Sequence, residues 1–183
     1  NKNQTFMFYK REKKGFKLFS LPGEKTRPTR DFVKEAMFSI IYNCEGMRVL
    51  DLFSGCGSLG LEALSRGAEY LDLVDISEKA IRIIQKNIDK LEYNDVAKTY
   101  HTKAETFLKI HCEKYDLIFA DPPYNKNIIN KIISDIIKEN KLSKSGYIVL
   151  EHSRHEEIDK KWIHYIGKQK RYGDTNVTIM SVA

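Results

Sequence analysis

The sequence predicts an α/β fold, in which a doubly wound, mostly parallel sheet has one antiparallel strand near its C-terminus. Two observations lead to this prediction. Short apolar runs, typical of buried strands, alternate with segments of helical periodicity between residues 29 and 150, as they do when helices join parallel strands. Beyond residue 160 the alternation stops and two strand-like runs follow one another, which is typical of a terminal hairpin.

The first elements of this pattern are a helix, a strand and a second helix. The first helix begins at Thr29, whose hydroxyl can cap it. Its apolar positions have helical spacing: Val33, Ala36, Met37, Ile40 and Ile41. Met47–Phe53 is predicted to be a buried strand that ends in a glycine-rich loop. The second helix begins at Ser58 and ends at Gly67, because glycine readily adopts the left-handed conformation of a helix terminus.

Two more strand–helix pairs follow. Tyr70–Val74 is predicted to be a strand, and the helix after it begins at Ser77. One face of that helix is apolar and consists of Ile81, Ile84, Ile88 and Leu91. A short strand near Val96–Tyr100 then leads to a helix around Glu105–His111.

The last elements are a strand–helix pair, a fifth strand and the terminal hairpin. Tyr115–Ala120 is predicted to be a strand, and the helix after Asn127 carries three pairs of isoleucines. Gly146–Leu150 is the fifth strand, and Trp162–Ile166 and Val177–Val182 form the hairpin. Ligands of such sheets bind at the carboxyl ends of the strands, so we expect functional residues in the loops that follow them.

The composition is that of one soluble domain. The 183 residues suffice for a substantial core, and 42% hydrophobic and 31% charged residues are ordinary values. No apolar run approaches the roughly 20 residues that span a bilayer. Cys44, Cys56 and Cys112 form neither a CxxC pair nor a disulfide framework, so we expect a reducing, cytoplasmic setting. No further ligand joins His152 and His155, so we predict no metal site and place both in loops or at the surface.

The excess positive charge is confined to the N-terminus. The formal net charge is +6, yet residues 1–34 alone carry +7 and the remaining 149 residues carry −1. Basic side chains attract phosphates, and the aromatic rings interleaved with them can stack on unpaired bases. The candidate nucleic-acid contacts of this segment are Lys10, Arg11, Lys13, Lys14 and Lys17. A solvated, flexible terminus is the commoner explanation of a charge run, so charge alone leaves both open.

A turn signal, Leu21-Pro22-Gly23, separates this segment from the rest of the chain. We therefore divide the chain into a basic arm or short hairpin, residues 1–24, and one domain, residues 25–183. Alternation around Phe16–Phe19 suggests the hairpin.

The loop after the first strand has the spacing of a nucleotide-binding loop. Gly55, Gly57 and Gly60 form a G-x-G-x-x-G pattern, and Asp75 follows 20 residues after Gly55, where an acid can bind ribose hydroxyls. This pattern alone suits NAD equally well. Asp51 favours another cofactor, because a carboxylate at this position repels a pyrophosphate and attracts the ammonium and sulfonium of S-adenosylmethionine.

We therefore predict S-adenosylmethionine as the cofactor. Its expected contacts are Asp51, Phe53, Ser54, Gly55, Gly57, Gly60, Asp75 and Ile76. The structural alternative is a tight strand–helix turn in which Asp51 is a helix or turn cap.

The predicted catalytic loop is Asp121-Pro122-Pro123-Tyr124, directly after the strand Tyr115–Ala120. An exocyclic amine of a base is a poor nucleophile, because its lone pair is delocalised into the ring. The Asp121 carboxylate and the Pro122 carbonyl can accept hydrogen bonds from its N–H groups and direct the lone pair at the methyl group, while the prolines fix the backbone. Tyr124 can stack on the base. The alternative is a rigid turn that Asp121 caps.

The chain resembles the class I amino-methyltransferases, which share a [DNS]-PP-[YFW] loop after the fourth strand. More narrowly, it resembles the bacterial 16S rRNA guanine-N2 methyltransferase family, small-subunit methyltransferase D. The segments Arg27–Phe38, Asp51–Ala63 and Arg171–Thr175 carry this closer resemblance, and the first and third are the more specific.

The resemblance implies a seven-stranded Rossmann-like methyltransferase sheet and a monomer that methylates the N2 amine of a guanine in 16S rRNA or a partly assembled small subunit. It also implies that Arg27 and Thr29 border the active site. Arg30 and Arg171 are further expected RNA contacts, and Ala104 and Glu105 are expected to contact the cofactor. Two positions depart from the family: Lys34, where Arg is common, and Lys103, where Asp or Asn is common near the adenine.

Other functions compete with this one. Adenine-N6 methyltransferases of DNA usually carry an added target-recognition domain, and this chain has one small domain. Protein-glutamine methyltransferases prefer Asn at the position of Asp121. A catalytically silent rRNA-binding factor would not need Asp51, Asp75 and Asp121 together.

Overall fold

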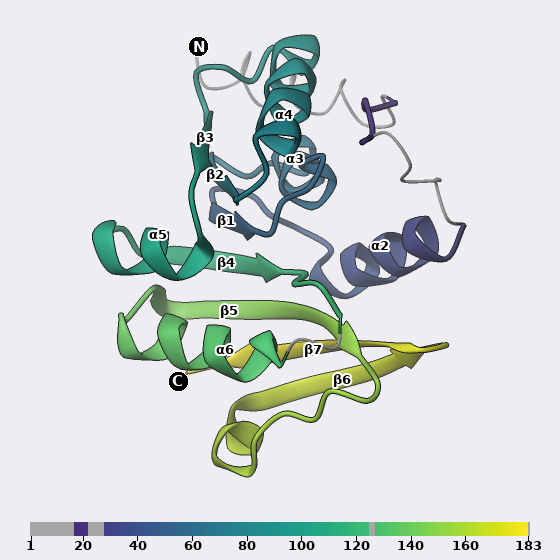
Figure 1. The fold of residues 1–183 in the computed structure, drawn as a ribbon, viewed down its shortest axis with the longest axis vertical. Helices are drawn as coiled ribbons and strands as arrows, with labels where there is room; N and C mark the ends of the chain where they lie inside the picture. Colours follow the sequence, from purple (N-terminus) through teal and green to yellow (C-terminus); the bar gives the residue numbers. More distant parts are fainter. Residues whose placement is uncertain (1–16, 22–27, 125–126, 183) are drawn as a thin grey trace.

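The computed structural model describes residues 17–21, 28–124 and 127–182. Their strands form one seven-stranded sheet in the order β3-β2-β1-β4-β5-β7-β6 (Figure 1). The strand β7 pairs antiparallel with both of its neighbours, β5 and β6, and thus runs opposite to the other described strands. The predicted fold class, with one antiparallel strand near the C-terminus, is therefore confirmed. The strands are β1 (Arg48–Leu52), β2 (Tyr70–Asp75), β3 (Ala97–His101), β4 (Tyr115–Ala120), β5 (Leu142–Ser153), β6 (Ile166–Tyr172) and β7 (Thr175–Ser181).

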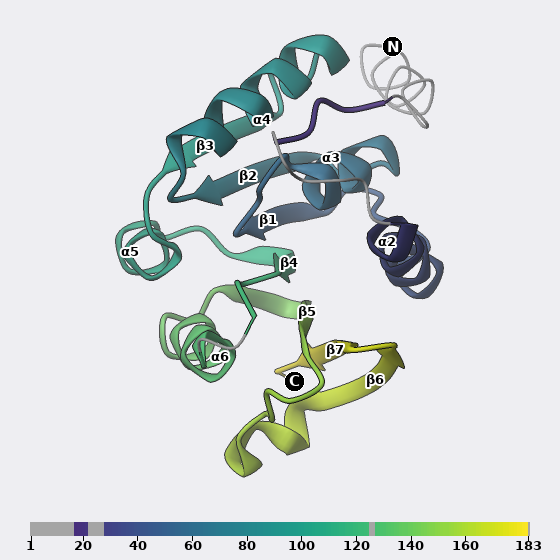
Figure 2. The same cartoon turned by 45° about the vertical axis from the view of Figure 1, so that its right-hand side comes forward.

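Helices cover both faces of the sheet. They are α2 (Pro28–Ile41), α3 (Ser58–Ser65), α4 (Glu78–Leu91), α5 (Ala104–Ile110), α6 (Ile128–Lys138) and the 3₁₀ helix η1 (Lys160–Tyr165). The first three pack on one face, which we call the α2 face, and α5 and α6 lie on the other (Figure 2). None of the helices within the described ranges is long and apolar enough to cross a membrane.

The core consists of two buried clusters, one on each face. On the α2 face, Phe38 of α2 lies against Phe119 of β4, with ring centroids 5.7 Å apart. On the opposite face, the isoleucine pairs of α6 supply Ile132 and Ile133. Because the central strands are buried on both faces, their sequences are continuous apolar runs rather than alternating ones.

The helix α4 shows how the sequence sets local structure. Ser77 caps its first turn by accepting a hydrogen bond from the Ala80 N–H, and Glu92 ends it in the left-handed conformation. Its apolar residues recur at helical spacing, so Ile84 and Ile88 are buried.

Parallel pairing brings the functional strand ends together. Leu52, at the end of β1, pairs with Val74 of β2 on one side and with Ala120 of β4 on the other. The residues that follow these positions, Asp75 and Asp121, therefore lie at the same end of the sheet, where the parallel strands have their carboxyl ends.

The hairpin begins later than predicted. The prediction of a strand over Trp162–Ile166 was wrong. These residues lie largely in η1, and the strand β6 begins only at Ile166. Trp162, Tyr165 and Ile166 pack against the core with helical spacing. The strand β6 is polar on both faces because it lies at the edge of the sheet, so it carries no apolar signal.

Two further predictions need correction. The fifth strand is longer than Gly146–Leu150, and it extends to include His152. His152 is therefore buried rather than in a loop: its Nδ1 donates to the carbonyls of Ser153 and Glu156, and burial lowers its pKa. His155 lies in an exposed turn, as expected. Most of the predicted N-terminal hairpin falls outside the described residues, and residues 17–21 form no strand.

Candidate active site

The glycine loop turns the chain from β1 into α3 in little space. Gly57 has φ +81°, a conformation that side chains with a Cβ rarely adopt. Gly60 lies in the first turn of α3, where a Cβ would come within 2.7 Å of Leu71 and 3.0 Å of the Asp51 carboxylate. Both glycines are therefore required for the close approach of α3 to the sheet.

The Asp51 carboxylate is buried beneath this loop, with 2% of the residue exposed. Its Oδ2 accepts a hydrogen bond of 3.0 Å from the Gly60 N–H, so Asp51 does cap α3. The pKa of Asp51 is raised to about 8, mainly by burial and to a smaller extent by the Asp75 charge, while the hydrogen bond from Gly60 opposes the rise. A buried acid of this kind ionises readily only when a cation lies beside it.

Asp75 supports the loop from the end of β2. One carboxylate oxygen accepts from the Gly55 N–H at 2.9 Å, and the other accepts from the Ser77 N–H at 2.8 Å. Asp75 thus fixes both the glycine loop and the start of α4. Each oxygen retains a further lone pair that a ribose hydroxyl could use.

Phe53 and Ser54 form the turn between β1 and the glycines. Phe53 has φ +58°, which is uncommon for a residue with a side chain. The Ser54 hydroxyl donates to the Asp51 carbonyl at 2.5 Å and accepts from the Val74 N–H at 3.1 Å. The turn is therefore held to both β1 and β2.

The remaining predicted cofactor contacts follow the ends of β2 and β3. Ile76 is 62% exposed just beyond β2, and its carbonyl lies 2.9 Å from His101 Nε2. Ala104 is buried at the start of α5. The Glu105 carboxylate lies 2.6 Å from Lys131 of α6, and this hydrogen bond lowers its pKa. Glu105 is thus engaged with the neighbouring helix.

The Asp121–Tyr124 loop follows β4, which pairs with β1. Asp121 is half-buried, Pro122 is buried and Pro123 is exposed. The Tyr124 hydroxyl donates to Glu151 Oε1 at 3.1 Å and lies 2.7 Å from the Thr175 hydroxyl. Burial raises the pKa of Tyr124, and the charges of Glu151 and Asp121 add to this effect, so the hydroxyl keeps its proton.

Sequence reasoning missed Glu151 as a site residue. It pairs with Val177 across β5 and β7, on the α2 face. The missed signal is a polar residue directly after the apolar run of β5, the same signal that identified Asp121 after β4.

Asn87 is a second residue that sequence reasoning missed. Its side chain is fully buried and makes three hydrogen bonds: it accepts from the Phe19 N–H at 2.7 Å, and it donates to the carbonyls of Phe19 at 3.0 Å and Cys56 at 2.9 Å. Lys90 adds a hydrogen bond to the Lys17 carbonyl. Asn87 thus joins residues 17–21 to the glycine loop.

Most of the predicted RNA contacts lie outside the part of the chain that the structure describes. Lys10, Arg11, Lys13, Lys14 and Arg27 lie outside the described residues, as do the side chains of Thr29 and Arg30 in the first turn of α2. Of the others, Lys17 and Arg171 are exposed, and Arg171 Nε donates to the Gly173 carbonyl at 2.9 Å.

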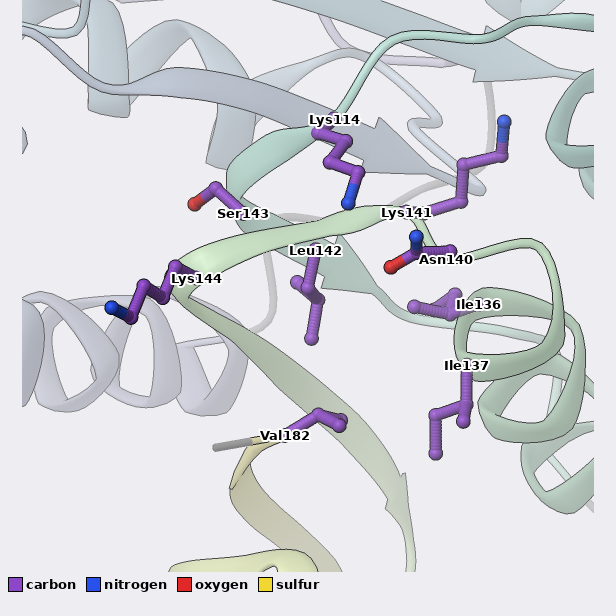
Figure 3. A pocket seen from close by; sticks show the side chains of 9 residues that line it. All are labelled: Lys114, Ile136, Ile137, Asn140, Lys141, Leu142, Ser143, Lys144 and Val182. Carbon is purple, nitrogen blue, oxygen red and sulfur yellow. The ribbon is translucent and has the colours of Figure 1, made fainter.

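A hollow of about 200 Å³ opens at the opposite end of the sheet, where α6 ends and β5 begins (Figure 3). Lys114, Lys141 and Lys144 contribute to its lining, and none of the predicted site residues does. Among the residues with described positions, no group of three or more His, Cys, Asp or Glu side chains could hold a metal ion.

Known proteins resemble this chain over most of its length. The model of the family described as conserved hypothetical protein 95 matches residues 11–181. The Bacillus subtilis protein YlbH is 38% identical over 172 residues, which are 91% of this chain and 94% of that protein. Ribosomal RNA small subunit methyltransferase D of Haemophilus influenzae is 32% identical over 142 residues, covering 75% of this chain and 74% of its own.

Solved structures also resemble this chain. A Streptococcus pyogenes protein of 36% identity superposes with a TM-score of 0.74, covering 80% of this chain and 92% of that one. The T. thermophilus 16S rRNA N2 methyltransferase RsmC, at 18% identity, shares the fold with a TM-score of 0.71, covering 89% of this chain and 45% of that one. The chain therefore belongs to the family described as conserved hypothetical protein 95 and, with its relatives, to the small-subunit rRNA methyltransferases D.

Proposed function

We propose that this protein transfers the methyl group of S-adenosylmethionine to the N2 amine of a guanine in 16S rRNA. The observation that carries the proposal is that two adjacent parallel strands each have an aspartate at their carboxyl end. Asp51 lies at the end of β1 beneath the glycine loop, and Asp121 leaves the adjacent β4. A cationic methyl donor and an amine acceptor would meet between them.

The residues of the β1 loop fit S-adenosylmethionine. The buried Asp51 carboxylate, whose pKa is raised to about 8, would be stabilised in its charged form by a cationic ligand. Asp75 fixes the loop that would hold the ribose and the amino-acid portion. When bound, the cofactor supplies an electrophilic methyl group on a positively charged sulfur.

The catalytic loop would orient the amine. The Asp121 carboxylate and the Pro122 carbonyl would each accept a hydrogen bond from one of its two N–H groups, so that the nitrogen lone pair faces the methyl group. The cofactor would supply its methyl group to this nitrogen, and its sulfur would keep the electrons of the broken carbon–sulfur bond. The methylated amine gives up one proton, which Asp121 or water accepts. The protein therefore contributes orientation more than strong base catalysis.

Glu151 supports guanine as the target base. The hydroxyl of Tyr124, the proposed stacking residue, donates to this carboxylate, so the carboxylate lies at the rim of the base site. Guanine presents an N1–H donor beside its amine, and adenine presents an acceptor there. A carboxylate attracts the first and repels the second.

The test is transfer of tritium-labelled methyl groups from S-adenosylmethionine to deproteinised rRNA, DNA and partly assembled small subunits. We expect label in rRNA or subunits, recovered as N2-methylguanosine after digestion to nucleosides. Label in DNA alone would instead indicate an adenine-N6 enzyme. Cofactor binding without transfer to any substrate would indicate a silent rRNA-binding factor.

A further inference from the structure

An aromatic pair with one exposed ring lies on the α2 face beside the catalytic loop. Phe32, near the start of α2, is 59% exposed, and its ring meets that of Tyr172 edge-on with centroids 5.8 Å apart. Tyr172 is the last residue of β6 and packs partly against the core, whereas most of the Phe32 ring faces solvent. Packing within the protein therefore accounts for Tyr172 but not for Phe32.

The aromatic pair is continuous with the catalytic loop. Tyr172 pairs with Thr175 across the turn of the C-terminal hairpin, so both side chains lie on one face of the sheet. The Thr175 hydroxyl lies 2.7 Å from the Tyr124 hydroxyl. A base stacked on Tyr124 and a base stacked on Phe32 would thus lie on either side of the Thr175–Tyr172 pair.

Positive charge continues along the same face. Lys168 and Lys170 precede Tyr172 at alternate positions of β6, so their exposed side chains lie on its side of the strand. The nearest acid in the turn, Asp174, is paired with Arg154 at 3.1 Å. The face therefore offers aromatic rings followed by two exposed lysines, which is the combination that binds single-stranded nucleic acid.

We propose that Phe32, Tyr172, Lys168 and Lys170 form a flanking-nucleotide surface. A base next to the target guanine stacks on Phe32, and the phosphates beyond it lie along the two lysines. This inference rests on the proposed function, because it takes the substrate to be RNA with an unpaired segment around the target. It adds Phe32 of α2 and three residues of the C-terminal hairpin to the RNA contacts expected from the sequence.

Removing the exposed ring tests the stacking. The probe is deproteinised small-subunit rRNA, and the variants are Phe32→Ser, Phe32→Trp and the control Tyr42→Ser, which removes a ring that is 82% exposed just after α2. We expect Phe32→Ser to raise the Kd and KM for rRNA about tenfold, as loss of one stacked base does. We expect wild-type values for Phe32→Trp and Tyr42→Ser, with unchanged cofactor affinity and kcat throughout.

Replacing the lysines tests the phosphate contacts. In the double variant Lys168→Gln/Lys170→Gln, the slope of log Kd against log salt concentration should fall by about 1.4, since each phosphate contact to a single strand contributes about 0.7. An unchanged slope would show that the two lysines do not contact phosphates, and it would overturn the proposal.

Filter binding of rRNA separates this inference from the proposed function. If the wild type binds rRNA but methylates nothing, the proposed function fails. The binding measurements on the variants still test the flanking-nucleotide surface in that case. If the wild type methylates rRNA and Phe32→Ser binds it with wild-type affinity, the flanking-nucleotide surface is overturned and the methyltransferase stands. A Phe32→Ser effect that Tyr42→Ser reproduces would also overturn it.

Discussion

The Tyr124 hydroxyl lies 2.7 Å from the Thr175 hydroxyl, and this contact joins the loop after β4 to the turn of the C-terminal hairpin. The two residues are 51 positions apart in the sequence, so the contact exists only because β7 pairs with β5. The antiparallel end of the sheet thus positions the aromatic ring that would hold the target base.

We expect Thr175→Val to lower kcat about 2–10-fold, which corresponds to loss of one hydrogen bond of about 0.5–1.5 kcal/mol. The valine keeps the shape of threonine, so cofactor affinity should not change. Tyr124→Phe removes the same bond from its other end. A double-mutant cycle measured on kcat should show that the two losses are not additive, and additive losses would mean that the contact does not position the loop.

Asp121→Ala should reduce methyl transfer by about 10²-fold or more, because an acceptor that orients the amine is lost. Cofactor affinity, measured by calorimetry, should stay nearly unchanged, since the proposed cofactor contacts lie on β1, β2, β3 and the segments that follow them. Equal loss of transfer and of cofactor affinity would show instead that Asp121 holds the site together.

Asn87→Leu should detach residues 17–21 from the glycine loop. It removes three buried hydrogen bonds and leaves their backbone partners unsatisfied, so we expect the free energy of unfolding to fall by about 1–3 kcal/mol. Hydrogen exchange at the Phe19 amide should become faster. The control is Asn94→Leu, since Asn94 is exposed. Unchanged exchange at Phe19 in Asn87→Leu would contradict the role given to Asn87.

The order of the elements could be predicted from the sequence because each buried strand is an apolar run and each helix is amphipathic. The strand β6 escaped prediction for the opposite reason: at the edge of the sheet, its Gly167–Arg171 segment is exposed and polar on both faces. An edge strand of this kind is specified by its partner rather than by its own pattern.

The same distinction separates the site residues. The positions of Asp51, Asp75 and Asp121 at one end of the sheet could be predicted, because each follows or ends its own strand and parallel strands have their carboxyl ends together. The role of Asn87 depends on Phe19 and Cys56, which lie 68 and 31 residues away. No local pattern reports such contacts.

Asp51→Asn should stabilise the protein without cofactor and weaken cofactor binding. The folded-state pKa of Asp51 is raised to about 8 from an ordinary 3.8, so between these values the native state binds a proton that the unfolded state has released. Stability therefore falls as the pH rises through this window. The asparagine keeps an acceptor for the Gly60 N–H and has no charge, so its advantage in Tm should grow from about pH 5 to about pH 9. A constant difference would mean that Asp51 is already ionised at low pH.

Glu151→Gln should relax the discrimination between guanine and 2-aminopurine. 2-Aminopurine keeps the exocyclic amine but has no N1–H, so the wild type should methylate rRNA carrying it at the target position about 10–100-fold less efficiently, as loss of a hydrogen bond to a charged group implies. The glutamine still has an acceptor oxygen for the Tyr124 hydroxyl, so the loop keeps its anchor, while the charge that attracts N1–H is gone. The measurement is the ratio of kcat/KM for the two RNAs. A ratio that Glu151→Gln leaves at the wild-type value would assign Glu151 to anchoring Tyr124 alone.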